Sequence, residues 1–131
     1  MKLSRFLGAA LAVLLALAAG CSLIQRGEQS SPHKLIEAYL EAFRNGDFEQ
    51  MIFLSGGWEG SPEELDFYRK VVEMIELKSY TIEEVEVINK NEAFVRVTLT
   101  LSLLGQEKTK TDNLRVLRKE GKWYLAEEIL D

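Results

Sequence analysis

The spacing of apolar residues changes twice along the chain. Residues 6–19 form an uncharged run of small and apolar side chains. Between residues 32 and 78 the apolar residues recur every three or four positions, which is typical of helices with one buried face. From residue 85 they alternate with polar residues, which is typical of strands. The pattern therefore predicts a leader, a helical half and a sheet half.

The helical half contains start and stop signals for three helices. The first helix is predicted to begin at Ser31-Pro32, a capping serine followed by proline at the first helical position, and to end at Asn45-Gly46. Asp47 is placed to cap a second, short helix. Ser61-Pro62 begins a third helix, which the apolar spacing extends to near Lys78.

The sheet half reads as four strands separated by turns. In the longest strand, aliphatic residues from Val95 to Leu103 alternate with a polar set comprising Arg96, Thr98, Thr100 and Ser102. We expect the aliphatic face to pack on the helices, and the polar face to meet solvent or a second copy. Three helices followed by four sequential antiparallel strands predict an α+β domain.

The leader has the layout of a secretory signal peptide. Lys2 and Arg5 precede an uncharged run over residues 6–20, which is shorter than the roughly 20 residues of a spanning helix. The stretch LAAGCS holds the only cysteine, Cys21, and resembles the lipobox of bacterial lipoproteins, although Ala18 stands where leucine is usual. The resemblance implies cleavage after residue 20 and acyl chains on Cys21.

Acyl chains on Cys21 would anchor the protein to the cell membrane or the outer membrane, on the extracytoplasmic side. Ser22 beside the cysteine favours the outer membrane where the cell has two. An uncleaved signal anchor and an unmodified cysteine are the alternatives. Residues 21–31 are then predicted to be the lipidated cysteine and a flexible polar tether, and residues 32–131 the folded domain.

The charge narrows the choice of partners. Loss of Lys2 and Arg5 with the leader takes the formal charge from −5 to −7. An acidic domain gains no electrostatic attraction from nucleic acid or from an anionic membrane surface. We therefore expect neither as a partner of the folded part.

Two segments resemble a known superfamily: LIEAYLEAFRNGDFEQM (residues 35–51) and LRVLRKEGKWYLAEEI (residues 114–129). They are similar to proteins with the nuclear-transport-factor-2-like, or cystatin-like, fold, and more narrowly to small bacterial lipoproteins of that superfamily. The resemblance implies helices packed into the concave face of a curved, four-stranded antiparallel sheet, which together form a cone. Its members include isomerases, dehydratases and polyketide cyclases as well as proteins that only bind.

The residues of this chain argue against catalysis. His33 is the only histidine and falls beside the predicted tether, so no catalytic triad and no cysteine–histidine metal site can form in the cone. Asp47 is the one tempting general base, but a helix cap explains it. The aliphatic strand face offers no polar atom to a substrate. We expect no enzyme activity, no metal and no cofactor.

Aromatic residues point to binding instead. Tyr39, Phe53, Trp58 and Tyr68 are predicted to line the cone mouth, although core packing is the alternative for each. Trp58 differs because it lies in a glycine-rich loop, where it supports no helix or strand. Three hypotheses follow: capture of a small apolar ligand, an adaptor role in an envelope assembly, with a homodimer left open, and a cyclase-like or isomerase-like enzyme.

Overall fold

A computed structural model describes residues 27–126, so the leader, Cys21 and the last five residues lie outside the described part. Its elements follow in the order α2 (Pro32–Asn45), α3 (Phe48–Leu54), α4 (Pro62–Glu73), β1 (Ile75–Asn89), β2 (Glu92–Leu103), β3 (Gln106–Lys119) and β4 (Lys122–Leu125). The strands form one antiparallel sheet in the order β1-β2-β3-β4. The predicted α+β architecture is confirmed.

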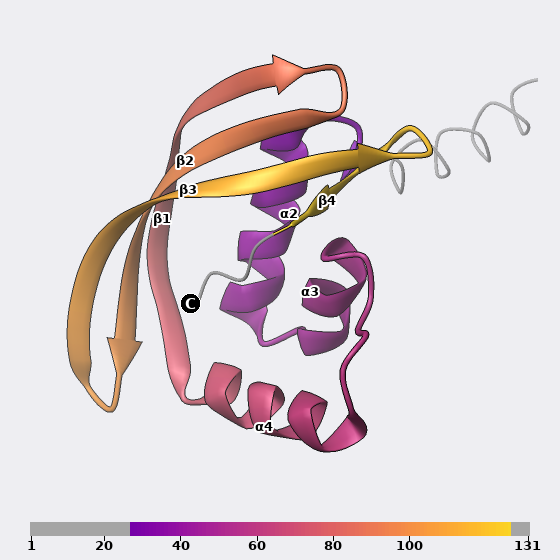
Figure 1. The fold of residues 1–131 in the computed structure, drawn as a ribbon. Coiled ribbons are helices and arrows are strands. Elements are labelled where there is room, and N and C mark those ends of the chain that lie inside the picture. Colours follow the sequence, from indigo (N-terminus) through magenta and orange to yellow (C-terminus); the bar gives the residue numbers. More distant parts are fainter. Residues whose placement is uncertain (1–26, 127–131) are drawn as a thin grey trace, which may run out of the picture.

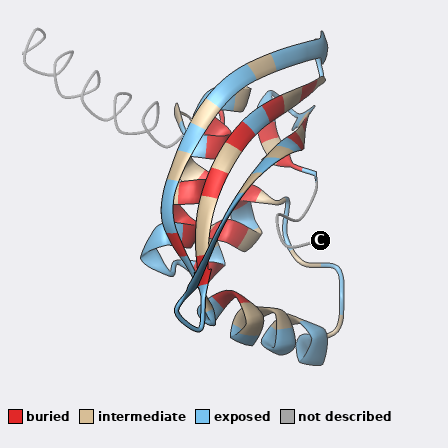
Figure 2. Ribbon diagram, turned by 90° about the vertical axis from the view of Figure 1, so that its left-hand side faces the viewer, coloured by how far each residue is buried: buried red, intermediate tan, exposed pale blue. Residues whose placement is uncertain are grey.

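The sheet curves around the helices, and the space between them is the core (Figure 1). Along β2, Ala93, Val95, Val97 and Leu99 are fully buried on the concave side. α2 meets them with six buried side chains: Leu35, Ile36, Tyr39, Leu40, Ala42 and Phe43. Figure 2 shows these buried positions as red bands on the middle strand and on the helices behind it. α2 and the first half of β2 therefore pack against one another through these side chains.

The helix starts were predicted correctly, but the end of the third helix was not. Ser31, Asp47 and Ser61 each accept a hydrogen bond from a backbone N–H at their helix start. α4 ends at Glu73, and Ile75 lies in β1 opposite Leu103 rather than in the helix. The backbone ladder with β2 outweighs the local helical spacing there.

The aliphatic face of β2 ends earlier than predicted. Leu101 is only partly buried and Leu103 is 45% exposed, so the buried run ends at Leu99. Ser102, predicted to lie on an open polar face, is only 8% exposed. It lies between Glu76 and Glu107 in the strand register, and their longer side chains flank it.

The prediction of a flexible tether up to residue 31 does not hold for Glu28 and Gln29, which contact the folded domain. Gln29 is buried, its side-chain amide donates to the Trp123 carbonyl at 3.1 Å, and its own carbonyl accepts from the Trp123 N–H at 3.0 Å. The Glu28 carboxylate also accepts a hydrogen bond from the Gln50 side chain at 2.8 Å. The folded unit therefore begins before Pro32, and the chain enters it beside β4. Within residues 27–126, no helix is long and apolar enough to cross a membrane.

Candidate binding site

The loop between α3 and α4 fixes the side chain of Trp58. Gly56 and Gly57 have φ angles of 88° and 102°, a region that side-chain-bearing residues rarely adopt, so the chain turns sharply after α3. The Trp58 indole N–H then donates to the Ser61 carbonyl at 3.1 Å. Gly60 lets the ring approach closely, since a Cβ there would lie 3.0 Å from the indole. The indole is thus held against the start of α4.

Trp58 stands at one end of a row of three aromatic rings. Its ring stacks on Tyr68 with centroids 5.9 Å apart and an interplanar angle of 29°. Tyr68 in turn meets Phe48 at 5.6 Å, and the Arg69 guanidinium lies 5.0 Å from the Phe48 ring centroid. Such contacts favour a defined ring orientation beyond simple burial. The row connects the loop, α4 and α3.

A hollow opens beside this row, and we call it the Trp58 cleft. Its inner part has a volume of about 140 Å³ and is lined by Ile52, Ser55, Gly57, Trp58, Tyr68, Leu125 and Ala126. A wider outer part of about 450 Å³ shares five of these residues and reaches Glu59, Glu64, Lys119 and Tyr124. An apolar cavity of about 150 Å³ accepts benzene. The inner part is therefore the size of one aromatic ring.

The structure separates the four aromatic residues that we predicted at one mouth. Trp58 and Tyr68 do meet at the cleft. Tyr39 is only 2% exposed, deep in the core, so it lines no opening. Phe53 is 53% exposed and lies outside the lining of the cleft. For Tyr39 the structure therefore gives the alternative, core packing.

The candidate catalytic groups lie on the surface. Asp47 is exposed, and its Oδ1 accepts from the Gln50 N–H at 3.2 Å, so it caps α3 as the alternative explanation required. A role for Asp47 as a buried base is thereby ruled out. His33 is exposed in the first turn of α2, as expected. The described residues contain no group of histidine, cysteine and carboxylate side chains fit to hold a metal ion.

One polar contact between α2 and β1 was not predicted. The Tyr80 hydroxyl donates to Glu41 Oε2 at 2.9 Å, and Arg44 pairs with the same carboxylate at 3.6 Å. Burial, reinforced by this hydrogen bond and by the negative charge of Glu41, raises the pKa of Tyr80 to about 12. The hydroxyl therefore keeps its proton at neutral pH and serves as a structural donor.

A second unpredicted feature is the ion pair of Lys110 and Asp112, which lie 2.9 Å apart on the concave side of β3. Both alternate with the buried Leu114 and Val116. The period-two pattern of β3 was the available signal, but the prediction used the pattern of β2 alone. The first half of β3 therefore presents polar side chains on the concave face of the sheet.

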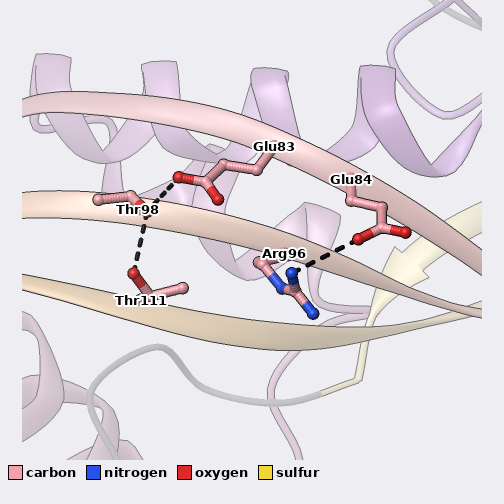
Figure 3. Close-up of polar contacts among 5 residues, drawn as sticks. All are labelled: Glu83, Glu84, Arg96, Thr98 and Thr111. Carbon is pink, nitrogen blue, oxygen red and sulfur yellow. Dashed lines mark hydrogen bonds and ion pairs between the residues drawn. The ribbon is translucent and has the colours of Figure 1, made fainter.

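The convex face carries its own polar network (Figure 3). Thr98 donates to Glu83 at 2.6 Å and contacts Thr111 at 3.0 Å, while Arg96 pairs with Glu84 at 3.5 Å. These hydroxyl and charged side chains therefore form hydrogen bonds and an ion pair with one another across β1, β2 and β3. A homodimer through this face stays a prediction.

Comparisons with known proteins identify the fold. Neither a protein-family model nor a curated protein sequence matches this chain. A SEC-C motif containing protein from Rhodopseudomonas palustris has a similar structure, with a TM-score of 0.59 and 17% identity over 75% of this chain and 77% of that one.

Two further solved structures have names that refer to the predicted superfamily or to an isomerase. An NTF-2 like protein of unknown function from Shewanella oneidensis has a TM-score of 0.54 and 22% identity, covering 71% of this chain and 89% of that one. A ketosteroid isomerase-like protein from Erwinia carotovora has a TM-score of 0.56 and 23% identity, covering 76% and 91%. The chain has the nuclear-transport-factor-2-like fold that its sequence predicted.

Proposed function

We propose that this protein is an exported, membrane-anchored lipoprotein whose domain binds a small apolar ligand without catalysis. The anchor is supported by the sequence: a basic start, a short apolar run, and Cys21 within LAAGCS. Two or more acyl chains give stable attachment, whereas one gives marginal attachment. The protein would then lie on the extracytoplasmic side of the cell membrane or the outer membrane.

The observation that carries the binding function is the Trp58 cleft. Its aromatic wall is already fixed, with Trp58 stacked on Tyr68 and hydrogen-bonded to Ser61. A fixed wall lowers the entropy cost of binding a flat apolar group. The inner part accepts one ring, and the outer part accommodates a second ring or a polar tail near Lys119.

The absence of catalysis is supported by what the interior holds. Among residues 27–126, the buried polar residues are Gln29 and Ser102, and no buried side-chain polar atom lacks a hydrogen-bond partner. General acid–base catalysis needs a titratable group within reach of the substrate. The cleft has carboxylates at its outer rim, Glu59 and Glu64, but none in its inner lining.

The test is a titration with N-phenyl-1-naphthylamine, a neutral fluorescent two-part aromatic probe. We expect saturable binding to the mature protein, and at least about tenfold weaker binding to Trp58→Ala, since loss of one buried aromatic contact costs about 1.4 kcal/mol or more. Phe53→Ala is the matched control, because it removes an exposed ring away from the cleft. Equal loss in both variants, or no binding to the parent, would contradict the assignment.

An adaptor role is the second candidate, and an exposed leucine in the β2–β3 turn favours it. Leu104 is 83% exposed at the β2–β3 turn with a φ of 52°, a conformation that glycine and asparagine adopt more easily. Glu120 has the same φ in the β3–β4 turn, so the fold itself does not require leucine. Leu104, with the exposed Leu103 and Met74 nearby, presents an apolar tip that an apolar groove on an envelope protein would accept.

A further inference from the structure

The charges of the described domain are unevenly distributed, although their sum is acidic. Lys90 lies in the β1–β2 turn, and three further cations lie at the ends of β3 and β4 that flank the β3–β4 turn: Arg118, Lys119 and Lys122. All four side chains are exposed, and none forms an ion pair in the part of the chain that the structure describes. The carboxylates at the same positions are Glu120, and Glu92 at the start of β2, which pairs with Arg115.

The two turns lie at the same end of the sheet. The Arg118 N–H donates to the Asn91 carbonyl at 2.8 Å, and Glu92 faces Leu117 in the register. Val87 and Ile88, 66% and 48% exposed, immediately precede the β1–β2 turn. We call Val87, Ile88, Lys90, Arg118, Lys119 and Lys122 together the basic end. It combines exposed apolar groups with unpaired cations, which is the composition of surfaces that bind the headgroup region of a bilayer.

The opposite end of the domain is acidic. α4 and the start of β1, residues 62–78, carry five carboxylates against three cations. In Figure 1, α4 runs along the bottom of the molecule, while the β1–β2 turn is at the top and the β3–β4 turn at the upper right. An anionic surface would therefore attract one end of the domain and repel the other.

The path of the chain brings the basic end toward the expected anchor. Gln29 forms two hydrogen bonds with Trp123, the neighbour of Lys122, so the chain enters the domain at this end. Gln29 is eight residue steps from Cys21, a reach of at most about 29 Å when extended. A lipid on Cys21 would hold the basic end within reach of the bilayer surface.

We propose that the basic end lies against anionic lipid headgroups and orients the domain, with α4 and the Leu104 turn directed away from the membrane. This inference rests on the proposed lipid anchor. It replaces the expectation, drawn from net charge alone, that the folded part avoids an anionic membrane. The Lys and Arg side chains contact phosphates, and Val87 and Ile88 enter the region between headgroups and acyl chains.

The test labels lysines on the lipidated protein reconstituted into vesicles, with a membrane-impermeant amine reagent and mass spectrometric readout. One set of vesicles contains phosphatidylglycerol and phosphatidylethanolamine, and the other contains phosphatidylcholine alone. We expect labelling of Lys119 and Lys122 to fall at least about fivefold on the anionic vesicles relative to Lys108 at the far end, because a contact with an anionic surface strengthens association by roughly that factor per cation. High salt should remove the protection.

Charge reversal provides the matched variants. Lys119→Glu/Lys122→Glu should abolish the protection of Lys90 on anionic vesicles, relative to Lys108. Lys70→Glu/Lys78→Glu, which changes the opposite end, should retain it. Circular dichroism checks that both variants are folded. Protein that floats with vesicles but shows equal labelling of Lys119 and Lys108 overturns this inference and leaves the anchor intact. Protein that floats with neither vesicle type overturns both the anchor and the inference.

Discussion

α2 and α4 are both amphipathic helices of similar length, but the fold uses them differently. α2 buries six side chains, whereas α4 buries only Val72. α2 lies in the concave face of the sheet, whereas α4 lies at the bottom of the molecule, below α2 and α3, and leads into β1 (Figure 1). Segments with few buried apolar contacts open at a lower free-energy cost than the core. We infer that α2 holds the fold together, while α4 contributes much less to its stability.

The largest expected effect tests this difference directly. Leu40→Ala in α2 should lower the free energy of unfolding by about 3–4 kcal/mol, because it opens a cavity in a fully buried core. Phe67→Ala in α4 should change it by less than about 0.5 kcal/mol, since that ring is 69% exposed. Urea denaturation of the two variants measures both. Comparable losses would mean that α4 is as integral to the core as α2.

A smaller effect is expected at the turn that adjoins the end of α4. Leu104→Asn should stabilise the domain by about 0.5–1 kcal/mol, because asparagine tolerates a positive φ and removes an exposed apolar group. Glu120→Asn in the matching turn serves as the control for the backbone contribution alone. Thermal denaturation compares them. A destabilised Leu104→Asn would indicate that Leu104 packs within the domain, which would weaken the adaptor hypothesis.

The smallest expected effect is on the pH dependence of stability, through the hydrogen bond between Glu41 of α2 and Tyr80 of β1. The pKa of Tyr80 is raised from 10.0 to about 12, so the folded state holds this proton more tightly than the unfolded chain. The resulting stabilisation is present below pH 10 and lost as the pH rises toward 12, and it amounts to about 1 kcal/mol after screening at this partly exposed site.

Ultraviolet titration of tyrosinate, compared with Tyr80→Phe, should locate this late step. Glu41→Gln should shift it toward the ordinary tyrosine pKa, because it removes the charge next to the hydroxyl. A Tyr80 that titrates near its model value of 10.0 would show that the hydrogen bond to Glu41 is not maintained in solution.

The elements and caps were predictable because their signals are local. A serine or aspartate before a helix and a glycine in a turn act within a few residues, and Ser31, Asp47 and Ser61 all cap as expected. The end of α4 was not predictable, since Ile75 leaves the helical pattern only because it pairs with Leu103, far along the chain. Local spacing does not include such a partner.

The candidate site was only half predictable for the same reason. A tryptophan in a glycine-rich loop marked Trp58, but nothing local distinguished Tyr39, which fills the core, from Tyr68, which lines the cleft. The basic end was missed because net charge averages over the whole chain. It appears only when hairpin pairing brings Lys90 beside Arg118 and Lys122.

The most direct test of the central claim, that the Trp58 cleft carries an apolar ligand, is native mass spectrometry of the mature protein released from its host envelope by proteolysis. We predict an added mass of a few hundred daltons on the parent domain, absent from Trp58→Ala and retained by Phe53→Ala. A parent domain with no added mass, monomeric or dimeric, would contradict the claim and favour the adaptor role.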